Sequence, residues 1–188
     1  LDPEKMLIVF IGRLITDKGA DLLAESIRQV LEEHEDEVNF FVLGSGENKF
    51  EDELRSLALT SSENFNSYIG YNERLAHLIY GGADFLLMPS RVEPCGLNQL
   101  YALRYGTIPI VSGTGGLKDT VTDFATPGGF GIRFENPSVV NIVDAVGRAV
   151  DLFDDEVKLS EIRQQIMEID HSWEHAVKEY LDLYKSIK

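Results

Sequence analysis

The segment "MLIVFIGRLITDKGADLLAESIRQVLEEHEDEVNFFVLG", residues 6–44, indicates the fold. It opens with a continuous apolar run over 6–12 and closes with a second one over 38–44. Between them, apolar residues recur from Leu22 to Leu31 with the spacing of a helix that buries one face. Uninterrupted apolar strands are typical of parallel sheets that are covered by helices on both faces. The segment therefore predicts a strand–helix–strand unit.

The same alternation continues to residue 134. Further strands are predicted at 65–70, 84–89, 107–112 and 131–134, with helical segments that include 72–81 and 97–105 between them. Alternating strands and helices with short loops predict an α/β fold, a Rossmann-like doubly wound parallel sheet.

Beyond residue 134 the pattern is helical only. Asn136 is the predicted N-cap, and Pro137 the first residue, of a helix with an apolar stripe from Val139 to Phe153. Two further amphipathic segments carry stripes over 159–169 and 173–187. Packing against the body of the domain is the simplest role for all three stripes.

Composition excludes several classes of function. The chain has 188 residues, 44% of them hydrophobic, which suffices for a proper core. A net charge of -15 argues against binding to nucleic acid or to anionic membranes. The single cysteine fits a reducing compartment, and the N-terminus does not resemble a signal peptide. The net charge is still compatible with an anionic small-molecule ligand, because salt screens exposed charges that lie more than about 10 Å from the site.

Ligands of open α/β sheets bind at the carboxyl ends of the strands, so the loops there are the candidate sites. In "GRLITDKG" (12–19), Arg13 and Lys18 are suited to phosphate oxygens, although the spacing alone equally allows two solvated surface cations. In "LGSGENK" (43–49), the glycines imitate a dinucleotide fingerprint, but Lys49 stands where the third glycine belongs. The fingerprint is therefore a weak signal, and a tight strand-to-helix turn explains that second loop better.

The loop "PSRVEPCGLN" (89–98) combines a carboxylate, a cysteine and a helix start. Gly96 allows a close backbone approach, and the free N–H groups of the following helix suit an anion. Glu93 would repel a phosphate, so we expect it to accept hydroxyls of the group attached to that phosphate. Cys95 lies near the positive helix end, but a thiol nucleophile needs a base, and the histidines stand in no motif that provides one.

A fourth loop, "SGTGGLKDTV" (112–121), repeats the glycine-then-helix pattern with Thr114, Gly115 and Gly116. Two such loops around one sheet edge, together with Arg13 and Lys18, make a site for a nucleotide diphosphate the leading hypothesis.

The motifs "GRLITDKG", "LGSGE", "GYNE", "PSRVEPCGLNQLYALRYGTIPIV", "TGGLKDTV" and "SWEHAVKEYLDLYK" occur in this order along nearly the whole chain. Together they resemble the C-terminal half of bacterial glycogen synthases and plant starch synthases. The resemblance implies one half of a GT-B fold and a retaining hexosyltransferase that works without metal or cofactor. Such enzymes move glucose from ADP-glucose or UDP-glucose to the non-reducing end of an α-1,4-glucan, in the cytoplasm or, in plants, the plastid.

The resemblance also implies roles for single residues. Arg13 and Lys18 match the pair that neutralises the diphosphate leaving group, and Glu93 matches the carboxylate that holds the donor glucose. Tyr71 matches an aromatic residue that stacks on the nucleobase. Cys95, Gly96, Leu97 and Asn98 match the loop whose backbone amides meet the sugar and the phosphates. We expect Thr114, Gly115 and Gly116 of the fourth loop to contact the substrate as well.

Two departures from the family pattern are visible. Asn98 stands where threonine or isoleucine is common, and Tyr101 stands where related GT-B families have a second glutamate. The family's N-terminal domain, which carries the acceptor groove, is not in this sequence. We therefore expect a donor-binding domain over 1–170, a helix over 171–188 that crosses onto the missing domain, and nucleotide binding without turnover.

Two alternatives are open at this point. One is a stand-alone module that binds a nucleotide sugar without turnover. The other is a different GT-B transferase, one that handles sucrose or mannose, against which "EPCGL" speaks because those relatives usually carry "EPFG" or "EGFG".

Overall fold

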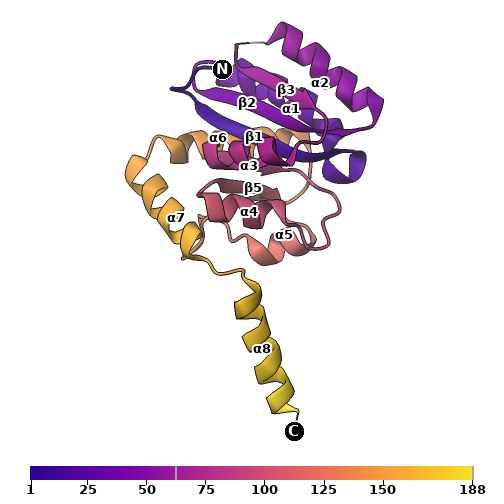
Figure 1. The fold of residues 1–188 in the computed structure, drawn as a ribbon. Helices are drawn as coiled ribbons and strands as arrows, with labels where there is room; N and C mark the ends of the chain where they lie inside the picture. Colours follow the sequence, from indigo (N-terminus) through magenta and orange to yellow (C-terminus); the bar gives the residue numbers. More distant parts are fainter. Residues whose placement is uncertain (62, 188) are drawn as a thin grey trace.

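The structure is a computed structural model that describes residues 1–61 and 63–187. Its strands are β1 (Met6–Leu14), β2 (Val38–Gly46), β3 (Phe65–Ile69), β4 (Phe85–Met88), β5 (Ile108–Ser112) and β6 (Ile132–Phe134). They form one parallel sheet in the order β3-β2-β1-β4-β5-β6 (Figure 1). The chain thus winds outward in both directions from β1 and β4, which confirms the predicted doubly wound sheet.

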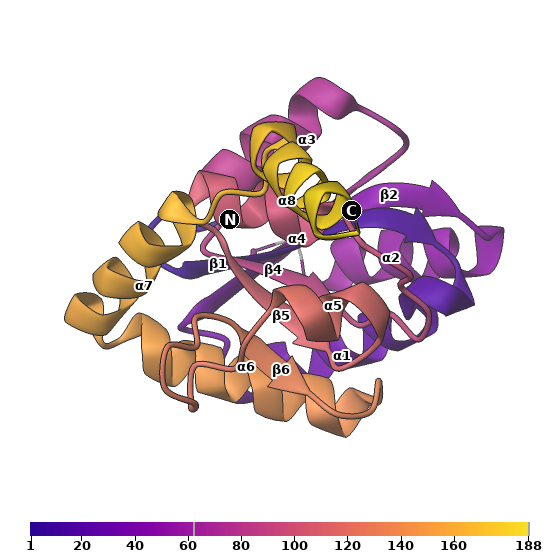
Figure 2. The same cartoon turned by 90° about the horizontal axis from the view of Figure 1, so that it is seen from below.

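Helices cover both faces of this sheet. They are α1 (Ala20–Glu33), α2 (Asn48–Thr60), α3 (Glu73–Gly82), α4 (Asn98–Tyr105), α5 (Gly115–Thr120), α6 (Val139–Phe153), α7 (Glu156–Glu168) and α8 (Trp173–Ser186). Helices α1, α2 and α6 lie on one face and α3, α4 and α5 on the other, while α7 packs on α4 and α6 (Figure 2). The sheet is therefore buried on both sides, as its apolar strands require.

The central strands and the inward helix faces form one core. Ile8 and Val9 of β1 and Phe85 of β4 have no exposed surface. Most of the apolar positions predicted for α1 and α7 are buried there too, including Leu23 and Ile166, whereas Leu22 and Ile169 are half-buried. The helical spacing in these two segments therefore identified packing faces correctly.

The glycine loop of β2 differs from the prediction. Gly44, Ser45 and Gly46 are not a strand-to-helix turn but the last residues of β2, which pair with the end of β1. A Cβ on Gly44 or Gly46 would lie 2.1 Å from a β1 carbonyl oxygen, so only glycine permits this close pairing. Both strands consequently run two residues beyond their predicted ends.

The start of α6 is the second correction. Ser138, not Asn136, caps the helix, because its side chain accepts a hydrogen bond from the backbone N–H of Asn141. Pro137 lies outside the helix rather than at its first position. Of the predicted stripe Val139, Val143, Val146, Val150 and Phe153, only Val146 and Val150 are fully buried. The buried face also contains Ile142, Ala145, Ala149 and Leu152.

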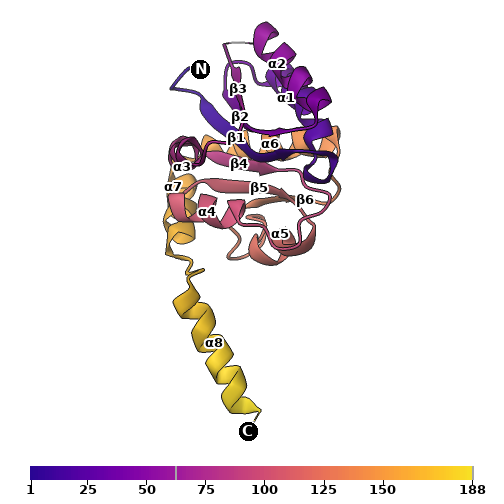
Figure 3. The same ribbon diagram turned by 45° about the vertical axis from the view of Figure 1, so that its right-hand side comes forward.

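Helix α8 buries none of its residues. It leaves the body of the domain after α7 and projects away from it (Figure 3). Its apolar stripe is exposed, with 78% of Trp173 and 63% of Tyr184 accessible. Packing against the body of the domain, the simplest role for this stripe, is therefore wrong, and the expectation that the helix over 171–188 crosses onto another domain stays a prediction.

Candidate functional site

Two adjoining cavities open where β1 and β4 end, at the point from which the sheet winds in opposite directions. The first has a volume of about 280 Å³ and the second about 360 Å³. Ile11, Gly12, Arg13 and Asn98 line both of them. Crevices at such switch points are where doubly wound sheets bind ligands.

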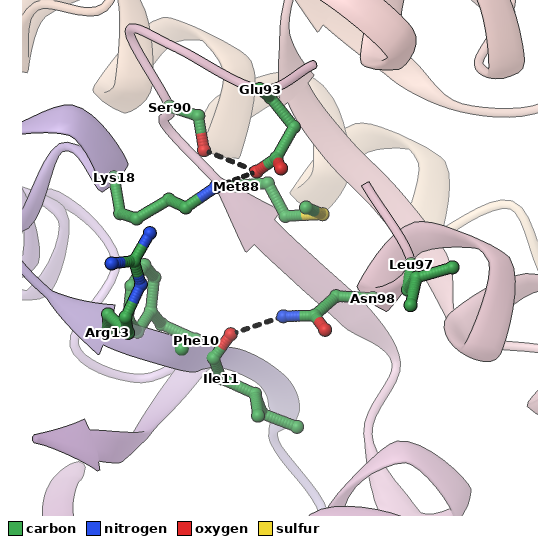
Figure 4. Close-up of a pocket in the computed structure, with 10 residues that line it drawn as sticks. Phe10, Ile11, Arg13, Lys18, Met88, Ser90, Glu93, Leu97 and Asn98 are labelled. Atoms are coloured by element: carbon green, nitrogen blue, oxygen red, sulfur yellow. Dashed lines mark hydrogen bonds and ion pairs between the residues drawn. The ribbon is translucent and has the colours of Figure 1, made fainter. Parts of the chain in front are cut away.

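The cationic side of the first cavity comes from β1 and from the 3₁₀ turn η1 (Thr16–Lys18) that follows it. Arg13 and Lys18 both extend into this cavity (Figure 4). Gly19 ends the turn with a φ of 74°, and a Cβ there would lie 2.2 Å from the carbonyl oxygen of Pro89. This close approach brings Lys18 over the loop that follows β4.

The opposite side of the cavity carries Glu93. This residue is 8% exposed, and its Oε2 accepts hydrogen bonds from Lys18 Nζ at 2.7 Å and from Ser90 Oγ at 3.1 Å (Figure 4). Among the described residues, Arg13 has no ion-pair partner, so its full charge faces the cavity. The predicted trio of Arg13, Lys18 and Glu93 is thus brought together around one space.

The loop that holds Glu93 is braced from two directions. On one side, Arg91 makes a bidentate ion pair with Asp21 at 2.6 and 2.9 Å, and its N–H donates to the carbonyl of Asp17. On the other side, the N–H of Gly116 donates to the carbonyl of Glu93 at 3.0 Å. These contacts hold the backbone of the loop, so the backbone position of Glu93 does not depend on the hydrogen bonds that its side chain makes.

The fourth loop packs against the backbone of the loop that carries Glu93. A Cβ on Gly115, whose φ is 45°, would lie 2.0 Å from the carbonyl oxygen of Glu93, and one on Gly116 would lie 2.1 Å from that of Cys95. Thr114 donates its hydroxyl to the carbonyl of Arg91. Within the described chain these three residues line neither cavity. Their predicted contact with a ligand stays a prediction.

The residues after Glu93 lead into α4. Cys95 is exposed, and Leu97 and Asn98 line the first cavity. No side chain of the described residues caps the first turn of α4, so its N–H groups are available to a ligand. The side-chain N–H of Asn98 donates a hydrogen bond to the carbonyl of Ile11 at 2.6 Å, which connects the start of α4 to β1. The proposed backbone contacts of Cys95 and Gly96 with a ligand stay predictions.

The second cavity has an aromatic wall that the sequence did not reveal. Tyr71 stands at its rim and is 85% exposed, while His77, Tyr80 and Tyr101 line it from α3 and α4. The rings of Tyr80 and Tyr101 lie 6.0 Å apart. Burial, followed by the proximity of Tyr101, raises the pKa of Tyr80 above its ordinary value, so its hydroxyl stays neutral. Only Tyr71 was singled out from the sequence, and only through the resemblance.

Among the described residues, no group of three or more His, Cys, Asp or Glu side chains is placed to hold a metal ion. None of the helices in the same part of the chain combines the length and the apolarity needed to cross a membrane.

A charged cavity beside an aromatic one, at the switch point of a parallel sheet, has the place and the lining typical of ligand sites in doubly wound α/β domains. The chain belongs to the family described as "Glycosyl transferases group 1", which matches residues 1–166. This match, together with the relatives and the starch synthase structure described next, confirms the predicted resemblance and the predicted half of a GT-B fold.

Two curated relatives narrow the family to the glycogen synthases. A glycogen synthase of Flavobacterium johnsoniae is 51% identical over all of this chain and 39% of its own length. One of Bacillus cereus is 41% identical over 98% of this chain and 39% of its own length. The chain thus spans about two fifths of the curated relatives it matches.

Solved structures agree with these relatives. The catalytic domain of starch synthase IV from Arabidopsis thaliana, bound to ADP and acarbose, has a TM-score of 0.87 and 32% identity. The match covers 97% of this chain and 38% of that chain. A sucrose-phosphate synthase of Thermosynechococcus elongatus shares the fold, with a TM-score of 0.74 at 18% identity.

Proposed function

We propose that this domain binds the nucleotide-diphosphate glucose of a glycogen or starch synthase. The observation that carries the proposal is the placement of Arg13, Lys18 and Glu93 around one cavity that continues into an aromatic one. The diphosphate would lie between the two cavities beside Arg13, the glucose against Glu93, and the base beside Tyr71. The similarity to a starch synthase bound to ADP supports this assignment.

The residues would divide the chemistry between them. Arg13, Lys18 and the N-terminus of α4 stabilise the negative charge that grows on the diphosphate as it leaves. Glu93 accepts hydroxyls of the glucose and stabilises the positive charge that develops at its anomeric carbon. We propose retention of configuration at that carbon, ADP-glucose or UDP-glucose as donor, and an α-1,4-glucan as acceptor on a separate domain.

Calorimetry with this chain tests the proposal. We expect weak binding of ADP that EDTA leaves unchanged, because protein cations neutralise the diphosphate. We also expect no incorporation of radiolabelled glucose into glucan. If the chain binds neither ADP nor UDP, the donor site is refuted. If the chain alone transfers glucose, the assignment of the acceptor to another domain is refuted.

Helix α8 fits the same proposal. Its apolar stripe is exposed in this chain, and we propose that it packs on the further domain that carries the acceptor site. Amide hydrogens over 173–186 should therefore exchange much faster than those of β1 and β4. Exchange as slow as in these strands would contradict the idea.

A further inference from the structure

The two oxygens of the Glu93 carboxylate have different surroundings. Oε2 accepts both hydrogen bonds, from Lys18 and from Ser90. Oε1 has no hydrogen-bond partner among the described residues, and it is not sealed off from solvent. Oε1 is therefore the atom left to accept a hydroxyl from a ligand in the first cavity.

The two donors to Oε2 differ in how firmly they are held. Lys18 has a long, flexible side chain that is 20% exposed, and it faces the same cavity as Arg13. An anionic diphosphate placed there competes with Glu93 for its ammonium group. Lys18 is thus a partner that ligand binding can draw away.

Ser90 is held by the body of the sheet. It follows β4 and is 2% exposed, and its carbonyl accepts a hydrogen bond from the hydroxyl of Ser112, a fully buried residue at the end of β5. Its side chain is short and neutral, so a phosphate exerts no Coulombic pull on it. The Ser90 hydroxyl can therefore stay on Oε2 when Lys18 leaves.

We propose that Ser90 is a positioning residue that aims Oε1 of Glu93 at the sugar of the donor. The proposal deepens the proposed function and rests on it. In this arrangement Lys18 serves the diphosphate while Ser90 alone keeps the carboxylate oriented during transfer. Without Ser90, the carboxylate would rotate or follow Lys18, and its bond to the sugar hydroxyl would weaken.

The test uses the complete enzyme that carries this domain. Ser90→Ala should lower kcat about tenfold, the effect of one hydrogen bond to a charged group, with the Kd for ADP changed less than twofold. Ser26→Ala is the matched control, because Ser26 on α1 is equally buried and its hydroxyl has no partner among the described residues. Ser90→Thr, which retains the hydroxyl, should recover most of the rate, and melting curves verify that each variant folds.

A set of monodeoxy donor sugars gives a readout that a purely structural role would not move. If a monodeoxy donor is transferred by Glu93→Gln as fast as the complete donor, the hydroxyl that it lacks is the one that hydrogen-bonds to Glu93. For the donor that lacks this hydroxyl, the tenfold effect of Ser90→Ala should disappear. An equal loss with every donor, or a Ser90→Ala rate like that of Ser26→Ala, would overturn the proposal while leaving the donor site intact. A harmless Glu93→Gln would overturn the proposed function together with this inference.

Discussion

The two sides of the first cavity are built differently. The β1 side presents Arg13 and Lys18, long side chains that reach into the cavity from a short turn. The β4 side presents Glu93 from a loop that hydrogen bonds brace against both neighbouring loops. Long cationic side chains suit the recognition of a charged group, because this attraction tolerates some movement of the side chain. A carboxylate on a braced loop suits hydrogen bonds that must be aligned in a transition state. The difference predicts that the β1 side governs both nucleotide affinity and the rate of transfer, whereas the β4 side governs the rate alone.

Replacement of Glu93 tests this division most sharply. Glu93→Gln should slow glucose transfer in the complete enzyme at least 100-fold, about 2.7 kcal/mol of transition-state stabilisation. Its affinity for ADP should not fall, and a rise of several-fold is expected, because Lys18 is no longer shared with a carboxylate 2.7 Å away. Steady-state kinetics and calorimetry measure the two effects. Glu25→Gln, in a surface ion pair of α1, is the control.

Arg13→Ala should affect both quantities. Arg13 would contact the diphosphate before and during transfer, so its loss should weaken ADP binding about tenfold and slow transfer at least as much. Arg55→Ala removes one positive charge from the surface of α2 and controls for the change in net charge. Unchanged ADP affinity in Arg13→Ala would mean that the β1 side is not the diphosphate side.

Tyr71→Ala should have a smaller effect, confined to binding. Stacking on a base contributes about 1–3 kcal/mol, and we expect the lower end because the ring is largely exposed. ADP affinity should fall about fivefold, while the affinity for inorganic pyrophosphate should not change. Tyr180→Ala, on the exposed face of α8, should leave both affinities unchanged.

Cys95→Ser should have the smallest effect, less than twofold on rate and affinity. The expected role of Cys95 runs through its backbone, and its carbonyl accepts from Gln99 whichever side chain is present. A loss as large as that of Glu93→Gln would instead indicate a thiol that takes part in the reaction.

The sequence by itself determined the alternation of strands and helices, the parallel sheet and the loops that carry the site. These features follow from local periodicity, because burial on one face or on both leaves a repeat in the chain. It also singled out Arg13, Lys18 and Glu93, since charged residues beside glycines at strand ends are exceptions to that repeat.

The tertiary structure decided which of these groups meet. Lys18 and Glu93 are 75 residues apart and make contact only because β1 and β4 are neighbours in the sheet. Ser90 gains its role from a carboxylate three residues away that turns back on it, and a buried serine carries no sign of this in the sequence. The exposure of α8 likewise depends on what surrounds it. The apolar stripe in its sequence is the same whether the helix packs on another surface or not. Local patterns record how much surface a residue buries, but the identity of its partner is set by which strand ends the fold brings together.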